Sequence, residues 1–263
     1  DPPTITHLAI FLIESALAEL WISWGIKPTA MIGYSLGEYV AAYVSGVFTL
    51  EDALHIVAER ARLIEAQPEG RMLAVSLGEA ELGGILPDGL GTKVELAIVN
   101  SPSMTVLGGS GPALEHIQRD LTRHGVASQL IQTDRPVHTS LMAPAAAQLA
   151  DLLARRPRRA PDIPYISNVT GSWISADDAT SPDYWARHLC HTLQFSDGIS
   201  QLLSDGYDLF LEVGPGQALM SFILPRVGDR AAGALQVLSS MPHRFMGQSD
   251  SVHLFRTLGN LWS

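Results

Sequence analysis

The residues best suited to chemistry form a Gly-x-Ser-x-Gly pentapeptide, in which Ser35 lies between Gly33 and Gly37. An apolar run at residues 30–32 precedes it, and an Ala-rich stretch up to residue 42 follows it. This order predicts a buried strand, a sharp turn and a helix, the nucleophile elbow that lifts a serine hydroxyl clear of a sheet. A Cβ at Gly33 or Gly37 would then collide with the neighbouring strand or helix. A Gly/Ser turn is often only structural, but the flanking strand and helix favour a nucleophile here.

The turn would also supply a donor and would need a base. It leaves the first N–H groups of the helix without partners, at the positive end of the helix dipole. We therefore expect the Leu36 N–H to hold an oxyanion formed when Ser35 attacks a carbonyl. Nine histidines compete for the role of base. His138 is favoured on position alone, because it lies where an inserted piece returns to the larger domain, and pockets form between subdomains.

Arg60 is a further candidate. It lies with Arg62 in a helix predicted at about 50–66, whose apolar residues recur at helical spacing. One of the two arginines should face inward. That side chain could form a buried ion pair, or it could be a fixed cation that clamps a carboxylate bidentately. The residue types leave both interpretations open.

Composition limits the class of protein. The 263 residues are 46% hydrophobic and 17% charged, which fits one globular domain, or one with a smaller inserted piece. The formal charge of −10 argues against nucleic acid, because phosphate binding needs clustered cations. The single cysteine, Cys190, excludes an internal disulfide and a cysteine-based metal site. We expect no bound metal.

The same patterns argue against a membrane location. We find no apolar run of the roughly 18 residues that a membrane span needs. The start, Asp1-Pro2-Pro3-Thr4, has neither the charge nor the apolar core of a signal peptide. We therefore expect a soluble, cytoplasmic protein.

The order of predicted elements indicates an α/β fold with an insertion. An apolar helix at 7–22 leads to the strand at 29–33, the elbow helix and the helix at about 50–66. The pattern then becomes shorter and β-rich, and its order β-α-β-β-α-β is that of a ferredoxin-like unit. We take 71–135 as a small subdomain inserted into a large α/β subdomain of 1–70 and 136–263. The six elements of the small unit are predicted at 72–77, 79–86, 94–99, 104–107, 112–124 and 126–131.

The chain after residue 136 returns to longer helices. A buried strand is expected at 208–213, and the Gly214-Pro215-Gly216 turn after it is expected to open another helix. The only dense basic run, residues 155–159, is typical of a solvated loop. The other expected elements are helices at about 141–155, 185–189, 197–204 and 252–261, and strands at 165–168 and about 234–239.

Longer motifs identify a family. The stretch Gly-Tyr-Ser-Leu-Gly-Glu-Tyr-Val-Ala-Ala, then Gly-Val-Phe-Thr-Leu-Glu-Asp-Ala-Leu, then Ala-Glu-Arg-Ala-Arg-Leu, resembles the acyltransferase domain of modular polyketide synthases. Further matches are Ala-Ile-Val-Asn-Ser-Pro at 97–102, Ser-Asn-Val-Thr-Gly at 167–171, Asp-Tyr-Trp-Ala-Arg-His-Leu at 183–189 and Leu-Glu-Val-Gly-Pro-Gly at 211–216. The resemblance covers nearly the whole chain in order. It implies a hydrolase-like parallel-sheet domain with an inserted ferredoxin-like subdomain, in agreement with the patterning.

The resemblance also implies roles for single residues. Ser35 would form an acyl-serine ester, and His138, which ends the family's four-residue specificity motif, would be general base and acid. Arg60, 25 residues after Ser35, would bind the free carboxylate of a malonyl-type substrate. The Leu36 N–H would line the oxyanion hole.

The implied reaction loads an extender unit in polyketide biosynthesis. A malonyl-type acyl group would pass from CoA to Ser35, and then to the phosphopantetheine thiol of an acyl carrier protein. The acyl-CoA and the carrier protein are substrates, and no bound cofactor is expected. A ketosynthase domain is the expected neighbour in the same synthase.

The sequence departs from the family at three places. It begins after the family's Gly-Gln-Gly-Ser segment, whose glutamine usually provides a second oxyanion donor. Tyr34 replaces the usual histidine before the nucleophile and changes the pocket wall. The specificity motif reads Arg135-Pro136-Val137-His138, where malonyl-selective relatives carry His-Ala-Phe-His and methylmalonyl-selective ones Tyr-Ala-Ser-His. Because Val137 is smaller than phenylalanine, we expect malonyl-CoA as the default substrate, with room for a 2-substituted malonyl unit.

Two other functions compete with this interpretation. A serine thioesterase or hydrolase would need an Asp or Glu between the serine and a late histidine, and would have no use for Arg60. A catalytically silent docking domain of a megasynthase is the third, and the presence of Ser35, Arg60 and His138 argues against it. An acidic carrier protein would need a local basic patch on this acidic chain, for which residues 155–159 are the candidate.

Overall fold

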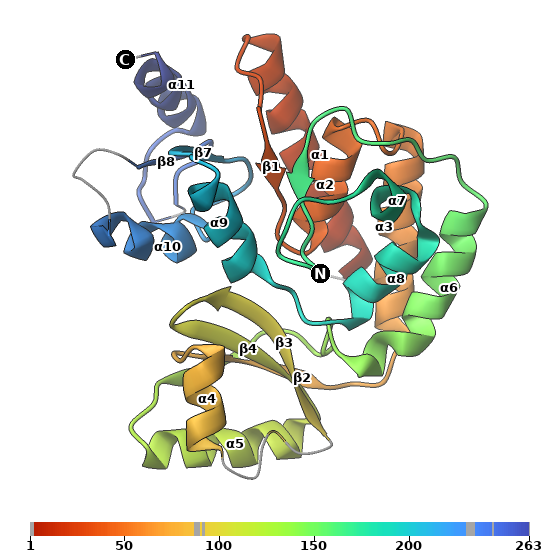
Figure 1. The fold of residues 1–263 in the computed structure, drawn as a ribbon, viewed down its shortest axis with the longest axis vertical. Helices are drawn as coiled ribbons and strands as arrows, with labels where there is room; N and C mark the ends of the chain where they lie inside the picture. Colours follow the sequence, from red (N-terminus) through yellow and green to blue (C-terminus); the bar gives the residue numbers. More distant parts are fainter. Residues whose placement is uncertain (1–2, 87–89, 91–92, 230–234, 244, 263) are drawn as a thin grey trace.

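The structure is a computed structural model that describes residues 3–86, 90, 93–229, 235–243 and 245–262. Its largest core lies among long helices that flank a short parallel sheet (Figure 1). In that sheet β1 (Met31–Ile32) pairs with β6 (Tyr165–Ile166), so that strands far apart in the sequence lie side by side. The helices around this core are α1 (Pro3–Ser23), α2 (Leu36–Val44), α3 (Leu50–Glu65), α6 (Ala143–Ala154), α7 (Ala176–Thr180) and α8 (Pro182–Cys190).

The second half of the large α/β part carries another parallel pair. β7 (Leu209–Glu212) pairs with β8 (Gln236–Ser239), next to α9, α10 and α11 (Figure 1). Parallel strands joined by helices are the hydrolase-like architecture expected from the sequence. The remaining elements are a 3₁₀ turn at Ser140–Met142, α9 (Phe195–Ser204), α10 (Met220–Ile223), a 3₁₀ segment at Leu224–Asp229 and α11 (Asp250–Leu261).

The inserted unit is an antiparallel sheet of order β3-β4-β2-β5, with α4 and α5 on one face (Figure 1). This strand order, with β-α-β-β-α-β along the chain, is the ferredoxin-like arrangement. Leu73, Leu107, Leu114 and Leu121 form a buried cluster of its own between sheet and helices. The exact domain boundaries, 71–135 against 1–70 and 136–263, stay a prediction. The elements are β2 (Arg71–Val75), α4 (Glu79–Ile85), β3 (Val94–Ser101), β4 (Met104–Gly109), α5 (Gly111–Arg123) and β5 (Ser128–Ile131).

Helix α1 corrects one expectation. Its segment Thr4–Ser23, with a mean hydropathy of 1.6, is long and apolar enough to cross a membrane by length and composition alone. The core helix of a soluble protein passes the same test. Here α1 packs against α2 and α3 and buries Phe11, while Leu12 and Ile13 are exposed. The length and composition of α1 therefore do not exclude a membrane span. Its contacts with α2 and α3 cover only one side of the helix.

The segment around β7 also differs from expectation. The strand predicted as buried at 208–213 is only half-buried, and 47% of Leu209 is exposed. Among the described residues β7 pairs with β8 alone, so part of its surface remains open. The helix expected at Gly216 is the four-residue α10, which starts only at Met220. The last strand begins at Gln236, and residue 234 of its predicted range lies outside the described residues.

The basic run at 155–159 is only partly a solvated loop. Arg156 forms an ion pair with Asp52, 2.8 Å between Nη1 and Oδ1. Arg158 donates to the carbonyl of Thr180 at 2.7 Å. Arg155 and Arg159 are exposed. Two of the four arginines therefore form an ion pair or a hydrogen bond with other parts of the chain, because carboxylate and carbonyl acceptors lie within their reach.

The two glycines of the pentapeptide have different roles. A Cβ added to Gly33 would lie 2.1 Å from the Glu38 backbone N and 2.2 Å from the Gly37 carbonyl carbon. The expected collision is therefore confirmed for Gly33, because the strand passes directly over the first turn of α2. For Gly37 the expectation was wrong, since its Cβ would meet only the Glu14 carboxylate, at 3.8 Å.

The comparison of Gly33→Ala with Gly37→Ala tests this packing. Gly33→Ala should lower the Tm by at least about 5 °C, because backbone atoms of the elbow must shift. Gly37→Ala should keep the Tm within about 3 °C, because the added methyl group meets no backbone. Thermal unfolding followed by circular dichroism measures both. A Gly33→Ala protein with an unchanged Tm would contradict the assigned contact.

Candidate active site

Ser35 lies at the turn between β1 and α2 with a strained backbone. Its φ of 51° and ψ of −107° lie in a region that residues with a side chain rarely occupy. This conformation turns the side chain toward His138, and Ser35 Oγ lies 2.7 Å from His138 Nε2. Ser35 precedes the inserted unit in the sequence and His138 follows it, and the fold brings the two side chains together. The contact has the geometry of a nucleophile and its base.

His138 is held by backbone groups rather than by a carboxylate. Only 1% of the residue is exposed, and its φ is 64°. Its N–H donates to the Leu189 carbonyl at 3.0 Å, and its Nδ1 lies 2.9 Å from the His188 carbonyl. Because a carbonyl only accepts, Nδ1 carries the proton and Nε2 accepts from the Ser35 hydroxyl. The sequence did not reveal this partner, since any residue type supplies a carbonyl.

Burial keeps His138 neutral. It lowers the pKa of His138 well below its usual range, and the nearby His188 and Arg60 lower this pKa further. A neutral imidazole with a free Nε2 lone pair is the state that a general base requires.

Asn168 fixes the elbow itself. Its Oδ1 accepts the Ser35 N–H at 2.9 Å, and its Nδ2 donates to the Gly33 carbonyl at 2.8 Å. The asparagine therefore bridges the residues on both sides of the turn and stabilises the strained backbone. Sequence reasoning assigned it no role, although it belongs to the Ser-Asn-Val-Thr-Gly motif at 167–171.

The Leu36 N–H is an unused donor beside the nucleophile. Leu36 is the first residue of α2, and the next two N–H groups, of Gly37 and Glu38, bond to Tyr34 and Ser35 carbonyls. Within the described part of the chain no acceptor takes the Leu36 N–H. It lies at the positive end of the α2 dipole, as an oxyanion donor would.

Arg60 is a buried cation without a counter-ion. It is 2% exposed, its guanidinium lies over the Tyr39 ring at 5.4 Å, and its Nε has no hydrogen bond. No carboxylate of the described residues forms an ion pair with it, so the buried ion pair considered from sequence is not formed. Its neighbour Arg62 is exposed and pairs with Glu59 at 2.8 Å. Burial lowers the pKa of Arg60, and the positive charge of Arg60 lowers the pKa of His138. An anion from outside the chain would satisfy it.

Tyr34 and Val137 lie near the junction with the inserted sheet. The Tyr34 hydroxyl donates to Asn100 Oδ1 on β3 at 2.9 Å, and its ring packs edge-on against Phe195. Burial raises the pKa of Tyr34. Val137 is half-buried and packs against both the large core and residues of the inserted sheet. Both side chains are therefore fixed where the two parts meet.

The fold and this site are typical of enzymes that transfer acyl groups through a serine. The family model described as "Acyl transferase domain" matches residues 4–247. The chain therefore belongs to the acyl transferase domain family, and it is an acyltransferase domain of the kind found in polyketide synthases.

Individual relatives agree with this assignment. A phenolphthiocerol/phthiocerol polyketide synthase of Mycobacterium tuberculosis is 34% identical over 255 residues, which are 97% of this chain and 17% of that protein. Polyketide synthase GfsB of Streptomyces halstedii is 35% identical over 239 residues, 90% of this chain and 4% of that protein. The chain thus spans a small share of the length of the curated relatives it matches.

Solved structures share the fold closely. The acyl transferase domain of SpnD, in complex with 2-(pent-4-yn-1-yl)malonyl, has a TM-score of 0.90 and 33% identity, over 97% of this chain and 60% of that chain. Malonyl CoA-acyl carrier protein transacylase from Clostridium perfringens has a TM-score of 0.86 and 27% identity, over 99% of this chain and 80% of that chain.

The pH dependence of Ser35 reactivity tests the state of His138. Because its pKa is lowered, the imidazole should stay neutral as the pH falls through the ordinary histidine value of about 6.5. The rate of Ser35 modification by a fluorophosphonate should therefore be flat near pH 6.5 and fall only at lower pH. Labelling that is quenched at several times and analysed by mass spectrometry measures this rate. A half-maximal rate at pH 6.5 or above would contradict the assignment.

Proposed function

We propose that the chain loads a malonyl-type extender unit from CoA onto the phosphopantetheine arm of an acyl carrier protein. The observation that carries this proposal is the unpaired, buried Arg60 within electrostatic reach of the Ser35–His138 contact. A buried guanidinium without a counter-ion is costly, and a substrate carboxylate would bind it bidentately. The proposal therefore concerns dicarboxylic half-thioesters rather than simple acyl groups.

The first half-reaction acylates Ser35. Its Oγ attacks the thioester carbonyl while His138 Nε2 takes the hydroxyl proton. The Leu36 N–H donates to the oxyanion, and the His188 carbonyl stabilises the imidazolium through Nδ1–H. The intermediate collapses to the malonyl-serine ester, and His138 returns the proton to the departing CoA thiolate.

The second half-reaction reverses these roles. The phosphopantetheine thiol gives its proton to His138 Nε2 and attacks the ester carbonyl, again with the Leu36 N–H on the oxyanion. The C–O bond to Ser35 breaks, and its oxygen recovers the proton from His138. Water must be kept out of this step, because it would release free malonate.

Room beside the substrate is the second part of the proposal. Tyr34 and Val137 would form the wall next to the α-carbon, where valine leaves more space than the phenylalanine of malonyl-selective relatives. The solved relative SpnD holds a malonyl group with a pentynyl substituent, which supports a pocket of this kind in the family. We propose malonyl-CoA as default substrate, with 2-substituted malonyl units accepted.

The alternatives have less support. An α/β-hydrolase or thioesterase triad needs an acidic residue on the histidine, whereas His138 Nδ1 faces a backbone carbonyl. A silent docking domain would not need a strained serine held within 2.7 Å of a neutral histidine.

Partners follow from the same chemistry. The named activity of the Clostridium perfringens relative supports an acyl carrier protein as acceptor, and a ketosynthase neighbour is proposed from the family resemblance alone. We propose the exposed Arg155 and Arg159 as the carrier-protein contact, since Arg156 and Arg158 are engaged within the fold. A cytoplasmic location fits these acyl-CoA substrates.

Intact-protein mass spectrometry after mixing with malonyl-CoA tests the nucleophile. We expect a malonyl-sized adduct on the wild-type protein and none on Ser35→Ala, because the Ser35 hydroxyl is the group that His138 contacts. His138→Ala should form the adduct at least about a hundredfold more slowly. An adduct that persists in Ser35→Ala would overturn the assigned nucleophile.

Arg60→Ala tests the carboxylate site. The acylation rate with malonyl-CoA should fall about a hundredfold, because the substrate carboxylate loses a buried cationic partner. The rate with acetyl-CoA should not fall, so the preference between the two is lost. Arg62→Ala, on the same helix but exposed, is the matched control and should retain the wild-type preference. A hydrolase would show little change in Arg60→Ala.

A further inference from the structure

Glu38 is a fully buried carboxylate just after the nucleophile. It is 0% exposed and occupies the first turn of α2, where the helix dipole favours an anion. Its Oε2 accepts the Asn168 N–H at 2.8 Å, and its Oε1 accepts the Tyr184 hydroxyl. No lysine or arginine among the described residues pairs with it. Burying a carboxylate in this position costs free energy unless its hydrogen bonds offset the loss of hydration.

One set of contacts leads from Glu38 to the nucleophile. The Asn168 N–H that Glu38 binds belongs to the residue whose amide bridges Ser35 and Gly33. Glu38 therefore fixes the backbone of Asn168, and the Asn168 side chain fixes the strained turn. The hydrogen bonds of the Asn168 side-chain amide thus stabilise the φ of 51° at Ser35.

A second set of contacts leads from Glu38 to the base. Glu38 Oε2 lies 3.4 Å from Nε2 of His188, whose ring is also 0% exposed. The carbonyl of this same His188 holds Nδ1 of His138. The His188 ring packs edge-on against Tyr39 and against His138, with centroids 5.5 and 5.7 Å apart. A displacement of the whole His188 residue would therefore move the carbonyl that orients the base.

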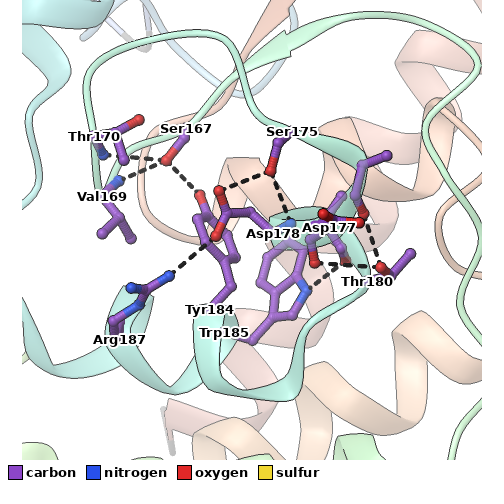
Figure 2. Close-up of polar contacts among 12 residues, drawn as sticks. Ser167, Val169, Thr170, Ser175, Asp177, Asp178, Thr180, Tyr184, Trp185 and Arg187 are labelled. Atoms are coloured by element: carbon purple, nitrogen blue, oxygen red, sulfur yellow. Dashed lines mark hydrogen bonds and ion pairs between the residues drawn. The ribbon is translucent and has the colours of Figure 1, made fainter.

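Tyr184 orients Glu38 itself. Its hydroxyl donates to Glu38 Oε1 and lies 2.8 Å from Ser167 Oγ. Figure 2 shows the Tyr184 hydroxyl directed at Ser167, whose oxygen accepts the N–H groups of Val169 and Thr170. The carboxylate is thus held between α8 and the loop that carries Asn168.

We propose that Glu38 is a positioning residue that aligns both members of the Ser35–His138 pair through Asn168 and His188. The proposal rests on the proposed function, because it concerns the rate of acylation at Ser35. A carboxylate is needed rather than an amide, because Asn168 N–H and Tyr184 O–H are both donors, and an amide offers only one acceptor atom. Glu38 does not touch the substrate, so it should affect the rate of the chemical step and not substrate binding.

Glu38→Gln tests this division. In single-turnover acylation by malonyl-CoA, the rate constant at saturation should fall tenfold to about a hundredfold, the usual effect of a small misplacement of reacting groups. The half-saturating concentration should change less than about twofold, because Arg60 is untouched. The overturning result is a saturating rate constant within about twofold of wild type.

Asp52→Asn is the matched control. Asp52 is another carboxylate buried in the first turn of a helix, where it binds Thr49 and Arg156 away from the elbow. Its loss of charge should lower the Tm without lowering the saturating rate constant. An equal fall of this rate constant in Asp52→Asn and Glu38→Gln would mean that general destabilisation explains both, and would overturn the proposal.

If Glu38→Gln does not fold, Tyr184→Phe tests the positioning role of Glu38 instead. It removes one donor to Glu38 and keeps the aromatic ring. A fall of the saturating rate constant of threefold or more, with an unchanged half-saturating concentration, supports the proposal, and an unchanged rate constant overturns it.

A fluorophosphonate separates this proposal from the proposed function. The reagent phosphonylates Ser35 with loss of fluoride and needs neither CoA nor a carboxylate site. If wild-type protein forms no malonyl adduct, the proposed function fails, and the phosphonylation rates still test Glu38. A rate that is tenfold lower in Glu38→Gln than in wild type supports positioning, and equal rates overturn it.

Discussion

The hydrogen bond between Ser35 and His138 is the interaction on which the site depends, and it requires two strained residues. Both have positive φ, 51° and 64°, in a region that costs about 1–3 kcal/mol for a residue with a side chain. Such conformations persist only when the surroundings hold them from several directions. Asn168 holds the serine from two sides, and the Leu189 and His188 carbonyls hold the histidine. The strain is therefore local, and the packed helices around it supply the stability.

Burial then sets the electrostatics of the pair. A carboxylate on Nδ1 would favour the imidazolium, but the carbonyl of His188 does so only weakly, so desolvation dominates and the histidine stays neutral. The same desolvation leaves Arg60 as a cation that no described side chain neutralises. A neutral base beside a cation without a counter-ion suits the proposed dicarboxylic substrate in two ways. The carboxylate would satisfy Arg60, and its charge would stabilise the imidazolium that forms during attack.

The sequence predicted these features to different degrees. The elbow was predictable, because Gly33 and Ser35 lie between an apolar strand and a helix, and helical periodicity predicted that one of Arg60 and Arg62 faces inward. The histidine was favoured only by its place at a seam. The partners of both catalytic candidates were not predictable, since the His188 group is a backbone carbonyl and Asn168 acts through a bridge that only the fold forms. β7 was wrongly predicted as buried, because an apolar run does not reveal whether both strand edges are covered.

The inserted sheet also holds the loop that follows the base. Glu95 on β3 accepts the Ser140 N–H at 2.8 Å, two residues after His138. Leu193 donates to the Ala97 carbonyl at 2.9 Å and accepts the Val99 N–H at 2.8 Å, which joins the sheet to the segment after α8. The loop that carries Val137 and His138 is therefore linked to β3, and so is the segment after α8. A change in the position of β3 would therefore move the loop that carries Val137 and His138, and it would also act on Tyr34, the neighbour of Ser35, through Asn100. The base and the segment next to the nucleophile are thus both linked to one strand of the inserted sheet, while Asn168 holds the turn of Ser35 from the large α/β part.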